Sequence, residues 1–135
     1  MHEHPLKPLF SENWETELNP ITEMLIGSAY KVSNVLGCGF LEKVYENALA
    51  FEMRKQGFSV EQQKDIWVFY EGAEVGFYSA DLLINQSVLV ELKTVRKLDE
   101  IHLAQCLNYL KATGFKICLL LNFGNPKVEV KRIIL

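Results

Sequence analysis

No apolar run in the 135-residue sequence is long enough to cross a membrane. A spanning helix needs ~18 or more consecutive apolar residues, and polar or charged residues interrupt every stretch well before that length. The N-terminal segment MHEHPLKPLFSENWETELNP also lacks the basic start and the apolar stretch of a secretory signal peptide. We therefore expect a cytoplasmic protein without a membrane anchor.

Cysteine is scarce, and its spacing excludes two kinds of small protein. Cys38, Cys106 and Cys118 are odd in number, and none belongs to a Cys-x-x-Cys pair. A disulfide-stapled fold or a zinc ribbon requires paired cysteines. We therefore expect free thiols in a reducing compartment.

An overall basic charge is also missing. The formal net charge is −3, which argues against a protein that binds nucleic acid through charge alone. The charge is nevertheless uneven: residues 91–135 carry eight Lys or Arg against four acids, and residues 1–90 carry six against thirteen. The basic C-terminal third is compatible with a polyanionic partner, although a solvated surface produces the same split.

The composition and length indicate one globular domain. Hydrophobic residues make up 49% of the chain and charged residues 23%, which is typical of a folded protein. Apolar residues recur at helical spacing over about 20–36, 41–56 and 98–113. Asn19 and Pro20 would cap and begin the first helix. We therefore expect an irregular lead-in over residues 1–19 and a folded domain over residues 20–135.

Between and after these helices the pattern changes to strands. Segments rich in Val, Ile and aromatic residues lie at 58–70, 74–85, 88–95, 116–124 and 126–135. The continuous apolar run KICLLLNFG indicates a strand that is covered on both faces. The order ααβββαββ predicts an α/β (α+β) fold, a single domain with a mixed central β-sheet flanked by helices.

The segment SADLLINQSVLVELKTV has the pattern of a β-hairpin that carries acids inside apolar strands. If residues 85–87 form a three-residue loop, Asp81 lies opposite Glu91 on one face of the hairpin. Lys93, two residues further along, then points to the same side. A two-residue loop would place the two acids on different faces.

Two carboxylates and a lysine on one face suit the cleavage of phosphodiester bonds. The oxygens of Asp81 and Glu91 could hold Mg²⁺ or Mn²⁺. Lys93 could position the attacking water or offset developing charge on a phosphoryl group. A Glu-x-Lys sequence also occurs by chance, so a surface Glu–Lys pair with an unrelated Asp on a solvated strand is the alternative.

Two helical segments carry further polar residues at spacings that share a face. In GFLEKVY, Glu42 and Tyr45 stand three residues apart, and in HLAQCLNYL, His102, Gln105 and Tyr109 lie on one face. The alternative interpretation treats the tyrosines as aromatics at the edge of the core and the other residues as helix surface. If they belong to the site in the hairpin, both helical faces should turn toward it.

These motifs resemble the bacterial GxxExxY family, whose signature corresponds here to Gly39, Glu42 and Tyr45. The resemblance continues through SADLLINQSVLVELKTV, HLAQCLNYLKATG and LNFGNPKVEVKRI, and so covers residues 21–135. That family is placed in the PD-(D/E)XK nuclease superfamily. The resemblance therefore implies a restriction-endonuclease-like fold.

The resemblance also implies roles for the acidic residues and the lysine. Asp81 would be the motif aspartate, and Glu91 and Lys93 would be the ends of the E-x-K element. Glu42 would be the acid contributed by the first core helix. The implied metal ligands are Asp81, Glu91, the Leu92 carbonyl and Glu42, the last directly or through water, and Lys93 would assist the attacking water.

Gln105 and Tyr109 match the Q-x-x-x-Y element of exonuclease-type branches of the superfamily, which implies that they steady Lys93 or the substrate backbone. The expected function is a Mg²⁺- or Mn²⁺-dependent nuclease that cleaves DNA, with RNA a less favoured substrate. The alternative is a non-catalytic nuclease-fold module that binds nucleic acid or a partner protein within a complex.

Overall fold

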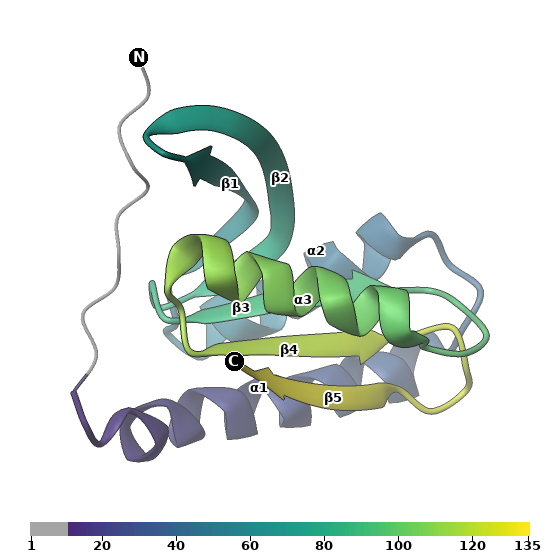
Figure 1. Cartoon of the computed structure of the whole chain (residues 1–135). Helices are drawn as coiled ribbons and strands as arrows, with labels where there is room; N and C mark the ends of the chain where they lie inside the picture. The colour runs from purple at the N-terminus through teal and green to yellow at the C-terminus, as the bar shows by residue number, and fades with distance from the viewer. Residues whose placement is uncertain (1–10) are drawn as a thin grey trace.

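Residues 11–135, the part of the chain that this computed structural model describes, form three helices and five strands in the predicted order (Figure 1). The helices are α1 (Trp14–Leu36), α2 (Glu42–Lys55) and α3 (Glu100–Thr113). The strands are β1 (Val60–Tyr70), β2 (Ala73–Ile84), β3 (Val88–Lys93), β4 (Ile117–Asn122) and β5 (Glu129–Ile134). Within this part of the chain, no helix is both long and apolar enough to span a membrane.

The strands form one mixed sheet in the order β1-β2-β3-β4-β5. β3 and β4 are parallel and are connected through α3, whereas the other neighbouring strands are antiparallel. The predicted fold is therefore confirmed: a single α+β domain in which helices flank a mixed central sheet.

A different helical layer covers each face of the sheet. α1 and α2 pack on the face that carries Leu82 and Val90, and α3 packs on the opposite face with Leu83 and Leu89. In Figure 1, α3 lies on the near side of the sheet and α2 on the far side. Because alternate residues of a strand point to opposite faces, a strand covered on both sides is apolar at nearly every position. This explains why both faces are apolar over residues 88–90 of β3 and 117–121 of β4.

The first helix begins at Trp14, so the expected irregular lead-in is wrong for its last six residues. Trp14 and Leu18 extend the apolar stripe that continues at Ile21, and Leu18 is buried in the core. This helical spacing favours a helix that starts before Pro20. Pro20 lies inside the helix at an exposed position and cannot donate to the carbonyl four residues earlier, because its nitrogen carries no hydrogen. The prediction for residues 1–10 lies outside the described residues.

The β1–β2 hairpin is the longest strand pair of the sheet. Its two-residue turn, Glu71 and Gly72, has positive φ at both residues, 49° and 82°, as a tight hairpin requires. A shift of register between Val68 and Phe69 marks a bulge, which increases the local twist. The outer part of the hairpin curls away from the rest of the sheet (Figure 1).

Leu18→Ala should lower the free energy of unfolding by about 2–5 kcal/mol, because it empties a core position that is 4% exposed. Thr16→Ala, at an exposed position of the same helical segment, should change it by less than about 0.5 kcal/mol. Urea unfolding followed by tryptophan fluorescence measures both. Equal, small effects would show that the segment before Pro20 does not dock on the core.

Candidate active site

β2 and β3 are joined by the three-residue loop that the sequence predicts. Leu83 pairs with Leu89 and Leu82 pairs with Val90, which confirms the predicted register. The ladder between the two strands ends at the Leu82–Val90 pair. The candidate site begins where this pairing stops.

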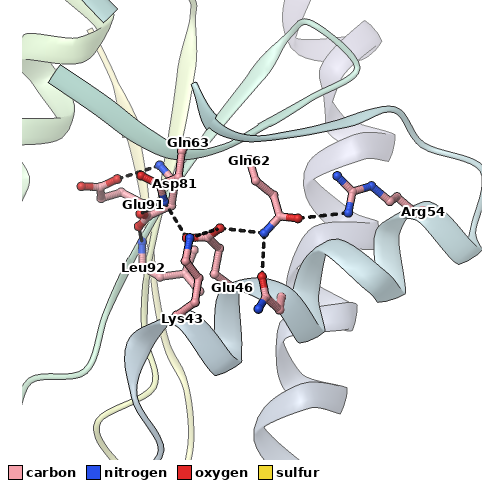
Figure 2. Close-up of polar contacts among 9 residues, drawn as sticks. Lys43, Glu46, Arg54, Gln62, Gln63, Asp81, Glu91 and Leu92 are labelled. Carbon is pink, nitrogen blue, oxygen red and sulfur yellow. Dashed lines mark hydrogen bonds and ion pairs between the residues drawn. The ribbon is translucent and has the colours of Figure 1, made fainter. Parts of the chain in front are cut away.

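Asp81 connects the two strands just beyond the last ladder pair (Figure 2). Its backbone N–H donates to Glu91 Oε1 at 3.2 Å, and its Oδ2 accepts from the Leu92 N–H at 2.7 Å. Because a backbone N–H of a strand lies in the plane of the sheet, the Asp81 carboxylate points into the gap between β2 and β3. The structure brings Asp81 and Glu91 together as predicted. The Asp81 side chain, however, points into the gap between the strands and not directly to the face of the sheet that carries Glu91.

Glu91 lies deep in the site, where it is only 4% exposed, and is held from α3. The Tyr109 hydroxyl donates to Glu91 Oε2 at 3.1 Å and also lies 3.3 Å from the Ser79 carbonyl oxygen. Lys93 Nζ is 3.9 Å from the same Glu91 oxygen. That separation is longer than a hydrogen bond, so Lys93 acts on Glu91 through its charge.

The protonation state of Glu91 reflects this environment. Burial, followed by the negative charge of Asp81, raises the pKa of Glu91 from 4.5 to about 8. A buried carboxylate loses its hydration, which disfavours the ionised form. The Asp81 N–H, the Lys93 charge and the Tyr109 hydroxyl oppose this shift. Burial and the Glu91 charge also raise the pKa of Tyr109, so its hydroxyl remains a proton donor in hydrogen bonds.

A second set of contacts holds the other side of Asp81, and sequence reasoning missed it (Figure 2). Gln63 Nε2 donates to Asp81 Oδ1 at 3.1 Å and to Glu46 Oε1 at 2.6 Å. Gln63 has φ of 55°, a left-handed conformation that is uncommon for a residue with a side chain. Gln63 also has no partner in the register of β1 with β2, between the Gln62–Leu82 and Lys64–Ala80 pairs. This irregular residue of β1 therefore links a carboxylate of α2 to the carboxylate of the hairpin.

Glu46 is the residue of α2 that accepts the Gln63 hydrogen bond. It is 3% exposed, and its carboxylate accepts from Lys43 Nζ at 3.0 Å and from Gln62 Nε2 at 2.7 Å. These donors satisfy a buried charge that would otherwise be costly. The one signal in the sequence is that Glu46 follows Glu42 by four residues and so shares its helical face.

Glu42 is half-buried at the start of α2. Burial, followed by the charge of Asp81, raises the pKa of Glu42, while the charge of Lys93 lowers it. Glu46, on the same helical face, is linked to Asp81 through Gln63, so this face of α2 turns toward the cluster.

The residues predicted from α3 divide into site neighbours and a structural residue. Gln105 lines a cavity of about 520 Å³ together with Lys93 and Tyr109. His102 Nδ1 instead accepts from the Asp99 N–H at 3.1 Å and completes a capping box at the start of α3. The structure thus brings Gln105 and Tyr109 to the lysine and gives His102 a capping role.

Tyr45 has a structural role. It is fully buried, its hydroxyl donates to the Gly37 carbonyl at 2.6 Å, and its ring stacks on Phe123 with centroids 4.7 Å apart. The Phe40 N–H donates to the same hydroxyl at 3.3 Å. These contacts hold the connection between α1 and α2, in agreement with the alternative interpretation of this tyrosine.

A family model described as the PD-(D/E)XK nuclease superfamily matches residues 19–133. The chain belongs to this superfamily. This confirms the superfamily that the resemblance implied, while membership of the GxxExxY family stays a prediction. No curated protein sequence matches the chain.

Two solved structures are similar to this superfamily member. An alkaline exonuclease (LHK-Exo) from Laribacter hongkongensis shares 15% identity with a TM-score of 0.46, over 84% of this chain and 81% of that one. The structure of SSO0001 shares 19% identity with a TM-score of 0.51, over 88% of this chain and 60% of that one. The second similarity supports the shared fold.

The donor atoms of the site suit a hard divalent cation, the kind of ion that nucleases of this superfamily generally use. The Leu92 N–H donates to Asp81, and the carbonyl of a strand residue points to the same edge as its N–H. The Leu92 carbonyl therefore faces the gap that holds the Asp81 carboxylate. Among residues 11–135, no three His, Cys, Asp or Glu side chains converge into a complete metal site. Asp81, Glu91 and this carbonyl would thus hold an ion whose shell water completes.

In EDTA, the wild-type protein should lose stability as pH rises from 4.5 toward 8. The unfolded Glu91 ionises near pH 4.5, whereas the folded residue keeps its proton until about pH 8, so rising pH favours the unfolded state. This group should remove up to about 1.4 kcal/mol of unfolding free energy per pH unit in that window. Urea unfolding at pH 5, 6, 7, 8 and 9 measures the effect.

Glu91→Gln is the matched control for that pH series, since the amide keeps the shape of the side chain and does not titrate. The stability of this variant relative to wild type should increase with pH and level off above pH 8. Parallel curves for the two proteins would contradict the raised pKa of Glu91.

Proposed function

We propose that this protein is a divalent-metal-dependent nuclease that hydrolyses phosphodiester bonds in DNA, with RNA a less favoured substrate and Mg²⁺ or Mn²⁺ as the cofactor. One observation carries the proposal: the Asp81 backbone N–H donates to the Glu91 carboxylate where β2 and β3 stop pairing, with the Lys93 ammonium 3.9 Å from Glu91. Superfamily membership supports the same assignment.

In this proposal Asp81, Glu91 and the Leu92 carbonyl hold the ion, and Glu42 reaches it directly or through water. The chemistry that such an ion supplies is polarisation of a phosphoryl oxygen and a lower pKa of a bound water. The chain keeps its two main carboxylates in fixed positions through different elements. Tyr109 of α3 holds Glu91, and Gln63 of β1 holds Asp81.

Lys93 is the residue of this chain that acts on the substrate. Its side chain is 21% exposed and lines the cavity beside the cluster, so it can meet a phosphate from solvent. An ammonium in a partly desolvated site positions a water nucleophile and stabilises negative charge that develops on phosphate. Gln105 lines the same cavity and would steady the lysine or the substrate backbone.

Two variants should distinguish metal binding from catalysis, because each removes only one of the two roles or removes the ligand on which both depend. Mn²⁺ at a hundredfold excess over its dissociation constant should stabilise the wild type by ~2.7 kcal/mol, because the ion binds only the folded state. Glu91→Ala should lose this stabilisation, since it removes a ligand. Lys93→Ala should keep it and lose cleavage by ~10²-fold or more, because the lysine acts on water and phosphate.

Thermal melts with Mn²⁺ and with EDTA measure the first effect, and cleavage of labelled single-stranded and duplex DNA and of RNA measures the second. Glu23→Ala, an exposed acid on α1, is the control and should behave as wild type in both. If wild type and Glu91→Ala respond equally to Mn²⁺, the two carboxylates are not a metal site. A non-catalytic module that binds nucleic acid or a partner protein would then be the better assignment.

A further inference from the structure

Two cavities lie between α3 and the outer part of the β1–β2 hairpin. One, of about 520 Å³, is lined by Lys93 and Tyr109, and the other, of about 620 Å³, extends to Lys111. Both are lined by Tyr78 and Asn108, so they adjoin and form one open groove that starts at the candidate active site. We call this surface the hairpin groove.

The charge of the hairpin groove differs from that of the whole protein. The chain carries 17 acidic residues and a net charge of −3. Among residues 11–135, no Asp or Glu lines either cavity, whereas Lys93 and Lys111 do. A concave surface that combines lysines with apolar walls favours a polyanion that also has apolar faces.

Tyr78 presents an aromatic ring in the middle of the hairpin groove. It is 48% exposed, although it lies on a strand whose opposite residue, Ile66, is buried against α3. Its ring lies against that of Tyr109 with centroids 6.0 Å apart. Gly76, two residues earlier on the same face, has no side chain, so the groove beside the ring is lined there by its backbone and by the Val68 side chain. An exposed aromatic ring of this kind is a platform on which a base can stack.

We infer that the hairpin groove binds a single-stranded segment of nucleic acid and leads it to Asp81, Glu91 and Lys93. A base stacks on Tyr78, and Lys111 contacts the phosphate backbone further along the groove. Bases in a duplex are already stacked and paired, so only an unpaired strand can use the ring in this way. The inference rests on the proposed function for the cleavage site, but strand binding itself requires no catalysis.

Fluorescence anisotropy with labelled (dT)₁₂ in EDTA tests the inference without cleavage. Tyr78→Leu keeps apolar contact with Tyr109 and removes the aromatic face, so it should weaken binding about 5- to 100-fold. Tyr78→Phe should bind as wild type does. The control Tyr70→Leu changes a 67% exposed tyrosine of the same hairpin outside the groove, and should leave affinity within twofold.

Salt titration tests the phosphate contact. Lys111→Ala should weaken binding of (dT)₁₂ and reduce the slope of log affinity against log salt by about 0.7, the contribution of one contact to a single strand. Lys131→Ala, which changes an exposed lysine on β5, should leave the slope unchanged.

Blunt 12-base-pair DNA should bind more weakly than (dT)₁₂, and Tyr78→Leu should not alter the affinity for this duplex. Comparable binding of (U)₁₂ would support the groove and extend its ligands to RNA.

Equal affinities of Tyr78→Leu and Tyr70→Leu for (dT)₁₂, or a preference for the duplex, would overturn the inference. If wild type cleaves DNA with metal while these variants bind normally, strand binding in the hairpin groove is rejected and the proposed nuclease function is kept. If the groove variants lose binding but wild type never cleaves, the nuclease function is rejected and strand binding in the groove is kept. Thermal melts of each variant confirm that it is folded.

Discussion

The hydrogen bond from the Leu92 N–H to the Asp81 carboxylate determines how the candidate site is built. Beyond the Leu82–Val90 pair, β3 has no further ladder pair with β2, and a backbone amide left unpaired in a buried strand would be costly. Asp81 satisfies that amide with its side chain at 2.7 Å. Its own N–H meanwhile reaches Glu91. The two strands can therefore separate without losing their connection, and the gap between them becomes the place where oxygen donors face one another.

The two helical layers stabilise different halves of this gap. From one face of the sheet, Tyr109 of α3 donates to Glu91. From the other, Glu46 of α2 holds Gln63, whose amide reaches Asp81. Each carboxylate thus has a neutral donor fixed by a buried element. Burial, followed by the nearby Asp81 charge, disfavours the ionised form of Glu91 and raises its pKa, so the ionised site carries a cost in stability. A bound cation would relieve that cost.

The hairpin groove extends the same arrangement outward. Tyr109 holds Glu91 through its hydroxyl and supports the Tyr78 ring through its own ring. One residue of α3 therefore joins the proposed cleavage site to the proposed path of the strand. β1 and β2 are longer than β3, β4 and β5, and the part of β2 that extends beyond the shorter strands carries Tyr78. A protein with an overall negative charge can in this way still present a local surface for a polyanion.

The sequence alone predicted the order of the elements and, on the condition that residues 85–87 form a three-residue loop, the proximity of Asp81, Glu91 and Lys93. These follow from periodicity along the chain, because a strand alternates its faces every residue and a loop of known length fixes the pairing. The apolar spacing of Trp14, Leu18 and Ile21 also indicates that α1 starts before Pro20, but a proline is typical of a first helical position and led to the later predicted start. Only the tertiary structure decided the link from Glu46 through Gln63. That link joins residues 17 positions apart through a left-handed backbone conformation, and no local pattern predicts such a contact.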